Sequence, residues 1–307
     1  MKCRADLKRK NESCSPETPN TVKARGKLGP DVASVKPRPE SARINVSFET
    51  IILDVKDGIA TVTLNQPAKR NAMTVQMGEE FLSAVGSLKE RDDLRVMVLT
   101  GSGRAFCAGG SLDMIQSRSA GSPEDNKATM ISFYRRFLSV LELPFPTIAS
   151  INGYAIGAGL CFALACDIRL ASEEAKMGMN FVRLGLHPGM GATWLLPRLV
   201  GTSRACELFF SGELVSGREA ERVGMVNRAV PAQDLAQETE RLARRIAGSA
   251  PVAMRGVKRG VYHGVGATLE DVFDYEATQQ AKCFETADFV EGVSAMMEKR
   301  EARFTGK

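Results

Sequence analysis

The stretch Ile151-Asn152-Gly153-Tyr154-Ala155-Ile156-Gly157-Ala158-Gly159 decides the fold class of this chain. It connects an apolar strand, residues 147–151, to a turn of small residues and then to an apolar helix, residues 159–166. The first N–H groups of a helix have no partner within the helix and lie at the positive end of its dipole. We therefore expect the N–H groups of Ala158 and Gly159 to form a site for an anion or a developing oxyanion.

A second turn of small residues, Phe106-Cys107-Ala108-Gly109-Gly110, follows another hydrophobic strand, residues 95–100. About 50 residues separate the two turns. We expect each turn to supply one N–H donor to the same carbonyl oxygen. Units of strand, turn and helix thus recur along the chain. This recurrence favours an α/β fold.

Hydrophobic periodicity and turn residues predict the other regular elements. These elements are a hairpin of strands 51–55 and 59–64 around Asp57-Gly58, and helices over 74–89 and 126–143. Residues 116–127 are polar and are expected to be mobile. The chain after Pro251 has apolar residues at helical spacing, so we expect helices from there to the end.

These patterns divide the chain into three regions. Residues 1–45 are expected to be a basic, disordered tail, residues 46–250 the core, and residues 251–307 a helical region. The tail is interrupted by prolines, and it lacks the apolar surface that would offset its chain entropy. A mitochondrial targeting peptide is the alternative interpretation, although the tail contains more acidic residues than such segments prefer.

Composition excludes several classes of function. The 307 residues are 44% hydrophobic and 25% charged, as in ordinary globular proteins, and no apolar run is long enough to span a bilayer. The net charge of +5 comes from residues 1–43, which carry +6, so the rest of the chain is close to neutral. We therefore expect no nucleic-acid or membrane partner. The location is expected to be intracellular, either cytoplasmic or mitochondrial.

The cysteine and histidine content predicts neither disulfides nor a metal site. None of the seven cysteines forms a C-x-x-C pair, and most lie in apolar segments, so we expect reduced, buried thiols. With only His187 and His263, no cluster of metal ligands is expected.

Four motifs in order along the chain resemble the crotonase superfamily, also called the enoyl-CoA hydratase/isomerase family. They are Lys69-Arg70-Asn71-Ala72-Met73, Ala105-Phe106-Cys107-Ala108-Gly109-Gly110, the block from Asn152 to Asp167, and Gly185-Leu186-His187-Pro188-Gly189-Met190-Gly191. The resemblance runs from about Phe48 to Phe304. It implies a right-handed spiral of ββα units with a C-terminal helical region that mediates oligomerisation. Members of the family assemble as homotrimers that often pair into homohexamers.

The resemblance also implies a site for an acyl-CoA substrate, with no cofactor beyond the coenzyme A of that substrate. The oxyanion-hole N–H groups of the family correspond to Gly110 and Ala158. Lys69 or Arg70 is then expected to pair with the phosphates of coenzyme A. Further substrate contacts are expected at three positions: Ala72, Ala108 and Phe181.

The chain departs from the family where its hydratases carry two catalytic glutamates, because Cys161 and Phe181 occupy those positions. A buried thiol is a poor base, and a phenyl ring exchanges no proton. The sequence leaves three interpretations open. Another side chain performs acid/base catalysis, with Asp113 the nearest candidate before Cys161 and His187; the oxyanion hole alone drives a reaction such as decarboxylation; or the protein only binds acyl-CoA.

Overall fold

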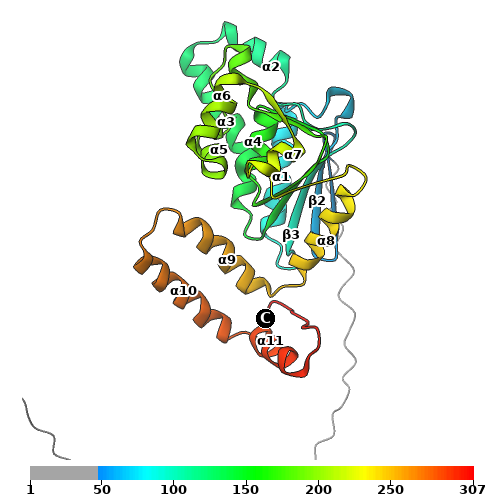
Figure 1. Cartoon of the computed structure of the whole chain (residues 1–307), viewed down its shortest axis with the longest axis vertical. Coiled ribbons are helices and arrows are strands. Elements are labelled where there is room, and N and C mark those ends of the chain that lie inside the picture. The colour runs from blue at the N-terminus through cyan, green and yellow to red at the C-terminus, as the bar shows by residue number, and fades with distance from the viewer. Residues whose placement is uncertain (1–47) are drawn as a thin grey trace, which may run out of the picture. The chain divides into compact units, whose positions relative to one another are not determined.

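The computed structural model describes residues 48–307, and the expected basic tail, residues 1–45, lies outside them. Two β-sheets and eleven α-helices make up this part of the chain (Figure 1). The strands are β1 (Ile51–Lys56), β2 (Ile59–Leu64), β3 (Val96–Gly101), β4 (Ala105–Cys107), β5 (Thr147–Ile151), β6 (Tyr154–Ile156), β7 (Ile168–Ser172), β8 (Lys176–Gly178), β9 (Leu214–Ser216) and β10 (Arg228–Val230).

The helices alternate with the strands up to residue 247 and continue alone after it. They are α1 (Val75–Lys89), α2 (Leu112–Ser117), α3 (Pro123–Leu138), α4 (Ala158–Leu164), α5 (Ala192–Val200), α6 (Thr202–Ser211), α7 (Gly217–Arg222), α8 (Leu235–Ala247), α9 (Pro251–Gly264), α10 (Leu269–Phe284) and α11 (Ala287–Glu298). Short 3-10 helices are η1 (Pro67–Lys69), η2 (Arg118–Ala120), η3 (Ser139–Glu142) and η4 (Asn180–Leu184). No helix within residues 48–307 combines the length and the apolar character needed to cross a membrane.

The larger sheet has six strands in the order β1-β2-β3-β5-β7-β10. The β1–β2 hairpin is antiparallel, as its Asp57-Gly58 turn predicts, and the other pairs are parallel. The smaller sheet has the order β4-β6-β8-β9. Three successive pairs, β3–β4, β5–β6 and β7–β8, each give one strand to the large sheet and the next to the small sheet. The chain then enters helices, which is the repeating ββα pattern expected from the sequence.

Helices cover both faces of the large sheet, as parallel sheets require (Figure 1). Along β3, Met97 and Leu99 belong to the main core, which includes Phe81 of α1. Their neighbours Val96 and Val98 belong to a second cluster together with Leu235 and Ala243 of α8. The alternation along one strand therefore fixes α1 and α8 on opposite faces of the sheet.

The structure corrects one expectation about local order. Residues 116–127 were expected to be polar and mobile, but most of them are helical, in α2, η2 and the start of α3. Ser111 and Ser122 cap α2 and α3 by accepting hydrogen bonds from the N–H groups three residues on, and Pro123 stands at the first turn of α3. Capping side chains thus form helices here without a strong apolar pattern. The second expected helix ends at Leu138, where the chain tightens into η3.

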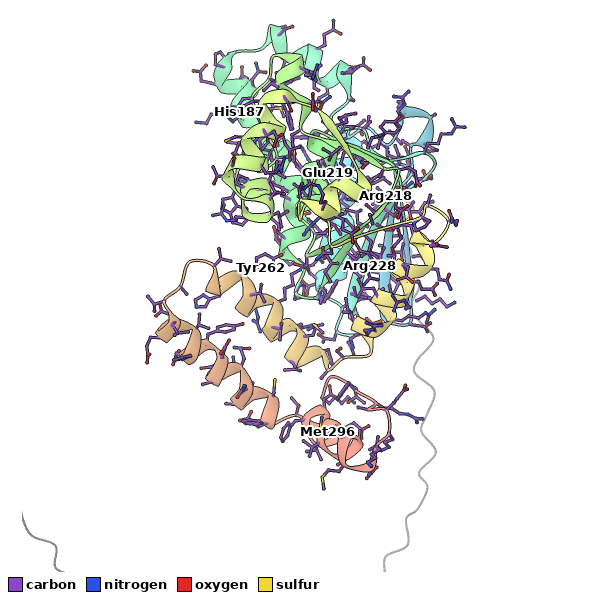
Figure 2. All side chains as sticks on the ribbon, viewed as in Figure 1. His187, Arg218, Glu219, Arg228, Tyr262 and Met296 are labelled. Atoms are coloured by element: carbon purple, nitrogen blue, oxygen red, sulfur yellow. The ribbon has the colours of Figure 1, made fainter. Side chains whose placement is uncertain are left out.

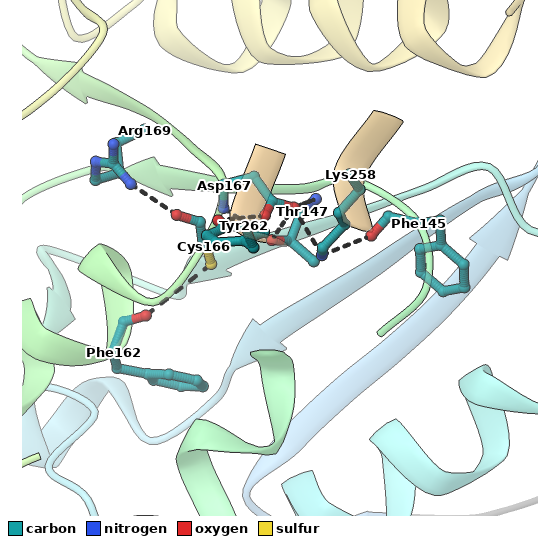
Figure 3. Close-up of polar contacts among 8 residues, drawn as sticks. All are labelled: Phe145, Thr147, Phe162, Cys166, Asp167, Arg169, Lys258 and Tyr262. Atoms are coloured by element: carbon teal, nitrogen blue, oxygen red, sulfur yellow. Dashed lines mark hydrogen bonds and ion pairs between the residues drawn. The ribbon is translucent and has the colours of Figure 1, made fainter. Parts of the chain in front are cut away.

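Helix α9 begins at Pro251, where the helical region was expected, and it is fastened to the sheet by a cluster around Asp167 (Figure 3). One carboxylate oxygen of Asp167 accepts hydrogen bonds from the N–H and hydroxyl groups of Thr147 and lies 2.8 Å from Lys258 Nζ. The other oxygen accepts the Tyr262 hydroxyl at 2.7 Å. Lys258 also donates to the carbonyl oxygen of Phe145 at 2.9 Å. One carboxylate therefore links β5, α9 and the segment after α4.

We predict that Lys258→Ala lowers the free energy of unfolding by about 3 kcal/mol, because it leaves the Asp167 carboxylate without its counter-ion. The side chains of Lys258 and Asp167 are only 9% and 16% exposed. Lys89→Ala is the matched control, since Lys89 pairs with Glu142 at the surface and its loss should cost less than about 1 kcal/mol. Denaturant unfolding of both variants measures the difference. Equal losses would show that Lys258 does not anchor α9.

Candidate active site

The two turns of small residues meet in the structure, backbone against backbone. A methyl group on Gly109 would lie 2.8 Å from the carbonyl oxygen of Ile156 and 3.8 Å from the nitrogen of Ala158. A methyl group on Gly159 would lie 2.3 Å from the carbonyl oxygen of Cys107. Only glycine allows both approaches, and Gly109 also adopts a left-handed φ of 94°. The sequence prediction that these turns cooperate agrees with this packing.

The N–H groups of Gly110 and Ala158 remain for a ligand. Gly109 and Ser111, on either side of Gly110, are hydrogen-bonded to Met73. Within residues 48–307, no acceptor pairs with the N–H of Gly110. Ala158 is the first residue of α4, where N–H groups lack an intrahelical partner.

Both residues line one cavity of about 640 Å³. Its walls come from α2, α3, η4 and the two turns, and most lining side chains are apolar. The polar side chains of the lining are Arg118, Ser119, Asn126, Tyr134, Asn180 and His187. The lining, which is drawn from residues 108–190, contains no aspartate or glutamate. The cavity therefore presents N–H donors to a ligand without a carboxylate beside them.

The structure separates the three candidate acid/base residues. Asp113 is exposed in the first turn of α2 and does not line the cavity. Cys161 is fully buried and does not line the cavity, and its thiol is 3.6 Å from the carbonyl oxygen of Gly189 and 3.8 Å from Met179 Sδ. Burial raises the pKa of the Cys161 thiol well above its usual value, so the thiol stays protonated.

His187 alone of the three lines the cavity. His187 lies in the segment between η4 and α5, whereas Tyr262 and Met296 lie on the C-terminal helices α9 and α11 (Figure 2). Its Nδ1 donates to the carbonyl oxygen of Pro188 at 2.7 Å, which leaves Nε2 as the nitrogen that can exchange a proton with a ligand.

Phe181, which the family resemblance places at the position of the second glutamate, lies beside the glycine turn. A methyl group on Gly157 would lie 3.6 Å from Phe181 Cζ and 3.5 Å from Asn180 Oδ1. Both side chains line the cavity. An aromatic edge and an amide therefore stand next to Ala158, so this wall of the site is shaped by packing and not by a titratable group.

The loop expected to hold coenzyme A, residues 69–73, lies against the turn of residues 106–110. Asn71 is fully buried, and its side-chain amide donates to the carbonyl oxygens of Ser102 and Ala105. The N–H of Ala108 donates to the carbonyl oxygen of Arg70 at 3.0 Å. The side chains of Lys69 and Arg70 remain exposed. Asn71 thus holds these two cations next to the cavity wall formed by Ala108.

The remaining predicted substrate contact, Ala72, lies in the same loop, and its N–H donates to the carbonyl oxygen of Lys69. Ala72 and the two cations do not line the cavity, whereas Ala108 does.

Two cavity residues escaped the sequence analysis. Tyr134 follows Met130 by one helical turn on α3, so both face the cavity, and a methyl group on Gly189 would lie 2.4 Å from its Oη. Burial raises the pKa of the Tyr134 hydroxyl, so the hydroxyl stays protonated at neutral pH and can donate a hydrogen bond. Arg118 lies at the end of α2 and brings the lining a permanent charge. The four-residue spacing between Met130 and Tyr134 on α3 is the sequence signal that could have indicated Tyr134.

No group of three or more His, Cys, Asp or Glu side chains that could hold a metal ion occurs in residues 48–307. The free cysteines of this part of the chain, which form no disulfide, include the buried residues Cys107, Cys161 and Cys166.

Known proteins share both the sequence pattern and the fold. The sequence model of the enoyl-CoA hydratase/isomerase family matches residues 54–307. The chain belongs to the enoyl-CoA hydratase/isomerase family. This family member is 36% identical over 261 residues to a 1,2-epoxyphenylacetyl-CoA isomerase of Escherichia coli, with 85% of this chain and 100% of the relative covered. It is 33% identical over 263 residues to a crotonyl-CoA hydratase of Syntrophomonas wolfei, with 85% and 100% covered.

A solved structure of an enoyl-CoA hydratase from Bacillus anthracis has the same fold as this enoyl-CoA hydratase/isomerase family member, with a TM-score of 0.79. The two chains are 33% identical, and the match covers 84% of this chain and 100% of the other. The expected crotonase-like α/β fold and the expected membership of an enzyme family are therefore confirmed. The division into three regions and the roles of individual residues stay predictions.

We predict that Gly109→Ala weakens thioester binding at least tenfold, because its methyl group would push the Ile156 carbonyl group away and displace the two turns. Gly86→Ala is the control, since Gly86 lies on the exposed face of α1 with nothing within 4 Å of the added methyl group. That change should stabilise the protein by about 0.5–1 kcal/mol. Calorimetric titration and thermal unfolding measure both effects. Unchanged binding by Gly109→Ala would contradict the assigned contact between the turns.

Proposed function

We propose that this protein is an enzyme acting on acyl-CoA thioesters, with Gly110 and Ala158 forming an oxyanion hole for the thioester carbonyl. The observation that carries the proposal is the pair of N–H donors on one wall of an apolar cavity. A thioester enolate carries negative charge on its oxygen. Fixed N–H groups stabilise that charge without reorganising as the reaction proceeds.

Proton transfer in this site does not rely on the two glutamates of the family's hydratases. Of the groups that line the cavity, Tyr134 and His187 can exchange protons with a substrate. Tyr134 stays protonated and can donate a hydrogen bond to a substrate, while His187 Nε2 suits a proton acceptor. Asp113 and Cys161 take no part in this proposal, because neither side chain lines the cavity.

Decarboxylation is the second candidate reaction, and the absence of carboxylates from the cavity lining favours it. Loss of carbon dioxide from a carboxylated acyl thioester generates the enolate without a base, so the oxyanion hole supplies most of the catalysis. A carboxylate in the lining would repel such a substrate. A protein that binds acyl-CoA without turnover is the remaining alternative.

Coenzyme A is proposed to bind with its phosphates at Lys69 or Arg70. Both side chains are exposed on the loop that Asn71 fixes against the turn of residues 106–110. A flexible cation pairs with phosphate without demanding one geometry. No cofactor beyond the coenzyme A of the substrate is proposed. The cellular location, cytoplasmic or mitochondrial, stays a prediction.

A product scan tests the proposed function. The protein is incubated with 2-enoyl-, dienoyl- and malonyl-type CoA thioesters, and the products are separated and weighed by mass spectrometry. Gain of water indicates hydration, a changed retention time at constant mass indicates isomerisation, and loss of carbon dioxide indicates decarboxylation. Thioester binding with no product from any substrate would overturn the enzymatic proposal in favour of a binding protein.

On the substrate that is turned over, we predict that Ala158→Pro lowers kcat about 100- to 1,000-fold, because proline removes one oxyanion-hole N–H. Thr202→Pro is the matched control. Like Ala158, Thr202 is the first residue of a helix and follows a glycine with positive φ, but it lies at the exposed start of α6. Circular dichroism must show both variants folded. A folded Ala158→Pro variant with normal kcat would contradict the assignment.

We also propose that the protein is a homotrimer or homohexamer that associates through α9–α11. These helices expose large apolar side chains, which a soluble monomer rarely gathers on one region. The most exposed of them are Val257, Val261, Val265, Leu269, Phe284, Val290, Met296 and Met297. Burial between subunits would remove this surface from water.

We predict that the double substitution Met296→Glu and Met297→Glu dissociates the assembly, since these side chains are 82% and 80% exposed in the single chain. Light scattering after size-exclusion chromatography gives the mass of the particle. The wild-type mass should be three or six times that of the chain. Ile52→Glu, at an exposed position on β1, is the control and should leave that mass unchanged. A monomeric wild-type protein would overturn the proposal.

A further inference from the structure

In the part of the chain that the structure describes, Arg118 is the one cationic residue in the lining of the cavity, where Ser119, Asn126 and apolar side chains of α2 and α3 surround it. It lies at the junction of α2 and η2, next to the lining residues Met114 and Ile115 of α2. Met130 and Phe133 of α3 line the same cavity. The amide of Asn126 donates to the carbonyl oxygen of Arg118 at 2.8 Å, and this bond fixes the turn that carries the arginine.

The guanidinium group of Arg118 has no anionic partner within residues 48–307. Its Nε and Nη2 contact only the hydroxyl of Ser117, at 3.4 Å and 3.1 Å. No carboxylate lies within 4.0 Å, in contrast to the many arginines of the surface that form ion pairs. A planar guanidinium has five N–H donors and matches a carboxylate through two parallel hydrogen bonds. Most of its binding capacity is therefore unused.

The position of Arg118 relative to the oxyanion hole sets where an anion would stand. Gly110 precedes α2 and Arg118 follows it, and both residues line the same cavity. Eight residues along a helical path correspond to about 12 Å between their backbones. An arginine side chain spans roughly half of that length when it points back along the helix. A ligand with its thioester carbonyl at Gly110 would thus meet Arg118 several bonds further along its acyl chain.

We propose that the preferred substrate is an acyl-CoA whose acyl chain ends in a carboxylate, and that Arg118 binds this carboxylate. The inference rests on the proposed function, because it places the thioester in the oxyanion hole of Gly110 and Ala158. The apolar side chains of α2 and α3 then contact the methylene groups between the two ends. Arg118 is a specificity-determining residue and takes no part in the chemical step.

Matched pairs of thioesters test the proposal. Glutaryl-CoA is compared with pentanoyl-CoA, and adipyl-CoA with hexanoyl-CoA, by calorimetric titration of the full-length protein. The wild-type protein should bind the carboxylated member of at least one pair about 10- to 100-fold more tightly, the range expected for a charged hydrogen-bonded pair. Arg118→Met should abolish that preference, and Arg118→Lys should retain part of it. Binding of the uncharged members should stay within about twofold.

Arg135→Met is the control for a simple change in net charge, because Arg135 is exposed on α3 and does not line the cavity. It should leave the preference intact. Equal weakening of both members of a pair by Arg118→Met would show that Arg118 contacts a phosphate of coenzyme A, and would overturn the proposal. Wild-type binding of the uncharged thioesters without any preference would also overturn it, while leaving the proposed function in place. Failure of every thioester to bind would overturn both.

Discussion

The contact between the backbone of Gly159 and the carbonyl group of Cys107 is the constraint on which the site depends. At this contact there is no room for a Cβ atom, so α4 begins directly against β4. Gly109 meets the Ile156 carbonyl group in the same way from the other turn. Two chain segments far apart in sequence are thereby brought into one rigid unit. The cavity and the free N–H groups of Gly110 and Ala158 follow from this packing.

The contacts also explain why so much of the fold could be predicted from the sequence. A strand followed by a turn that tolerates only small side chains leaves a clear pattern, and here the pattern occurs twice. The β1–β2 hairpin is equally predictable, because Asp57-Gly58 lies between two strands whose side chains alternate in burial. Where structure depends instead on single capping side chains, as at Ser111 and Ser122, the apolar pattern is weak and the helices α2 and α3 were missed or shortened.

The same weakness limited the prediction of the site. The backbone donors were predictable because glycines mark them, whereas Arg118 and Tyr134 enter the cavity only through the orientation of α2 and α3. Proximity in sequence was misleading for Asp113, which is three residues from Gly110 yet exposed. Cys161 shows the reverse case, since the family resemblance places it at a catalytic position, but it is fully buried, does not line the cavity and has a raised pKa. Spacing along a chain fixes which backbone atoms meet, but it does not fix which side chains reach a ligand.

The anchor at Asp167 has a consequence beyond holding α9. Asp167 stands three residues after Leu164, the last residue of α4, and Gly159 lies at the other end of that helix. Helix α4 has only seven residues, and packed contacts hold the chain close to both of its ends. The direction of the Ala158 N–H bond is thus set before any ligand arrives. The entropy cost of orienting this N–H group is met once, during folding, and does not recur at each turnover.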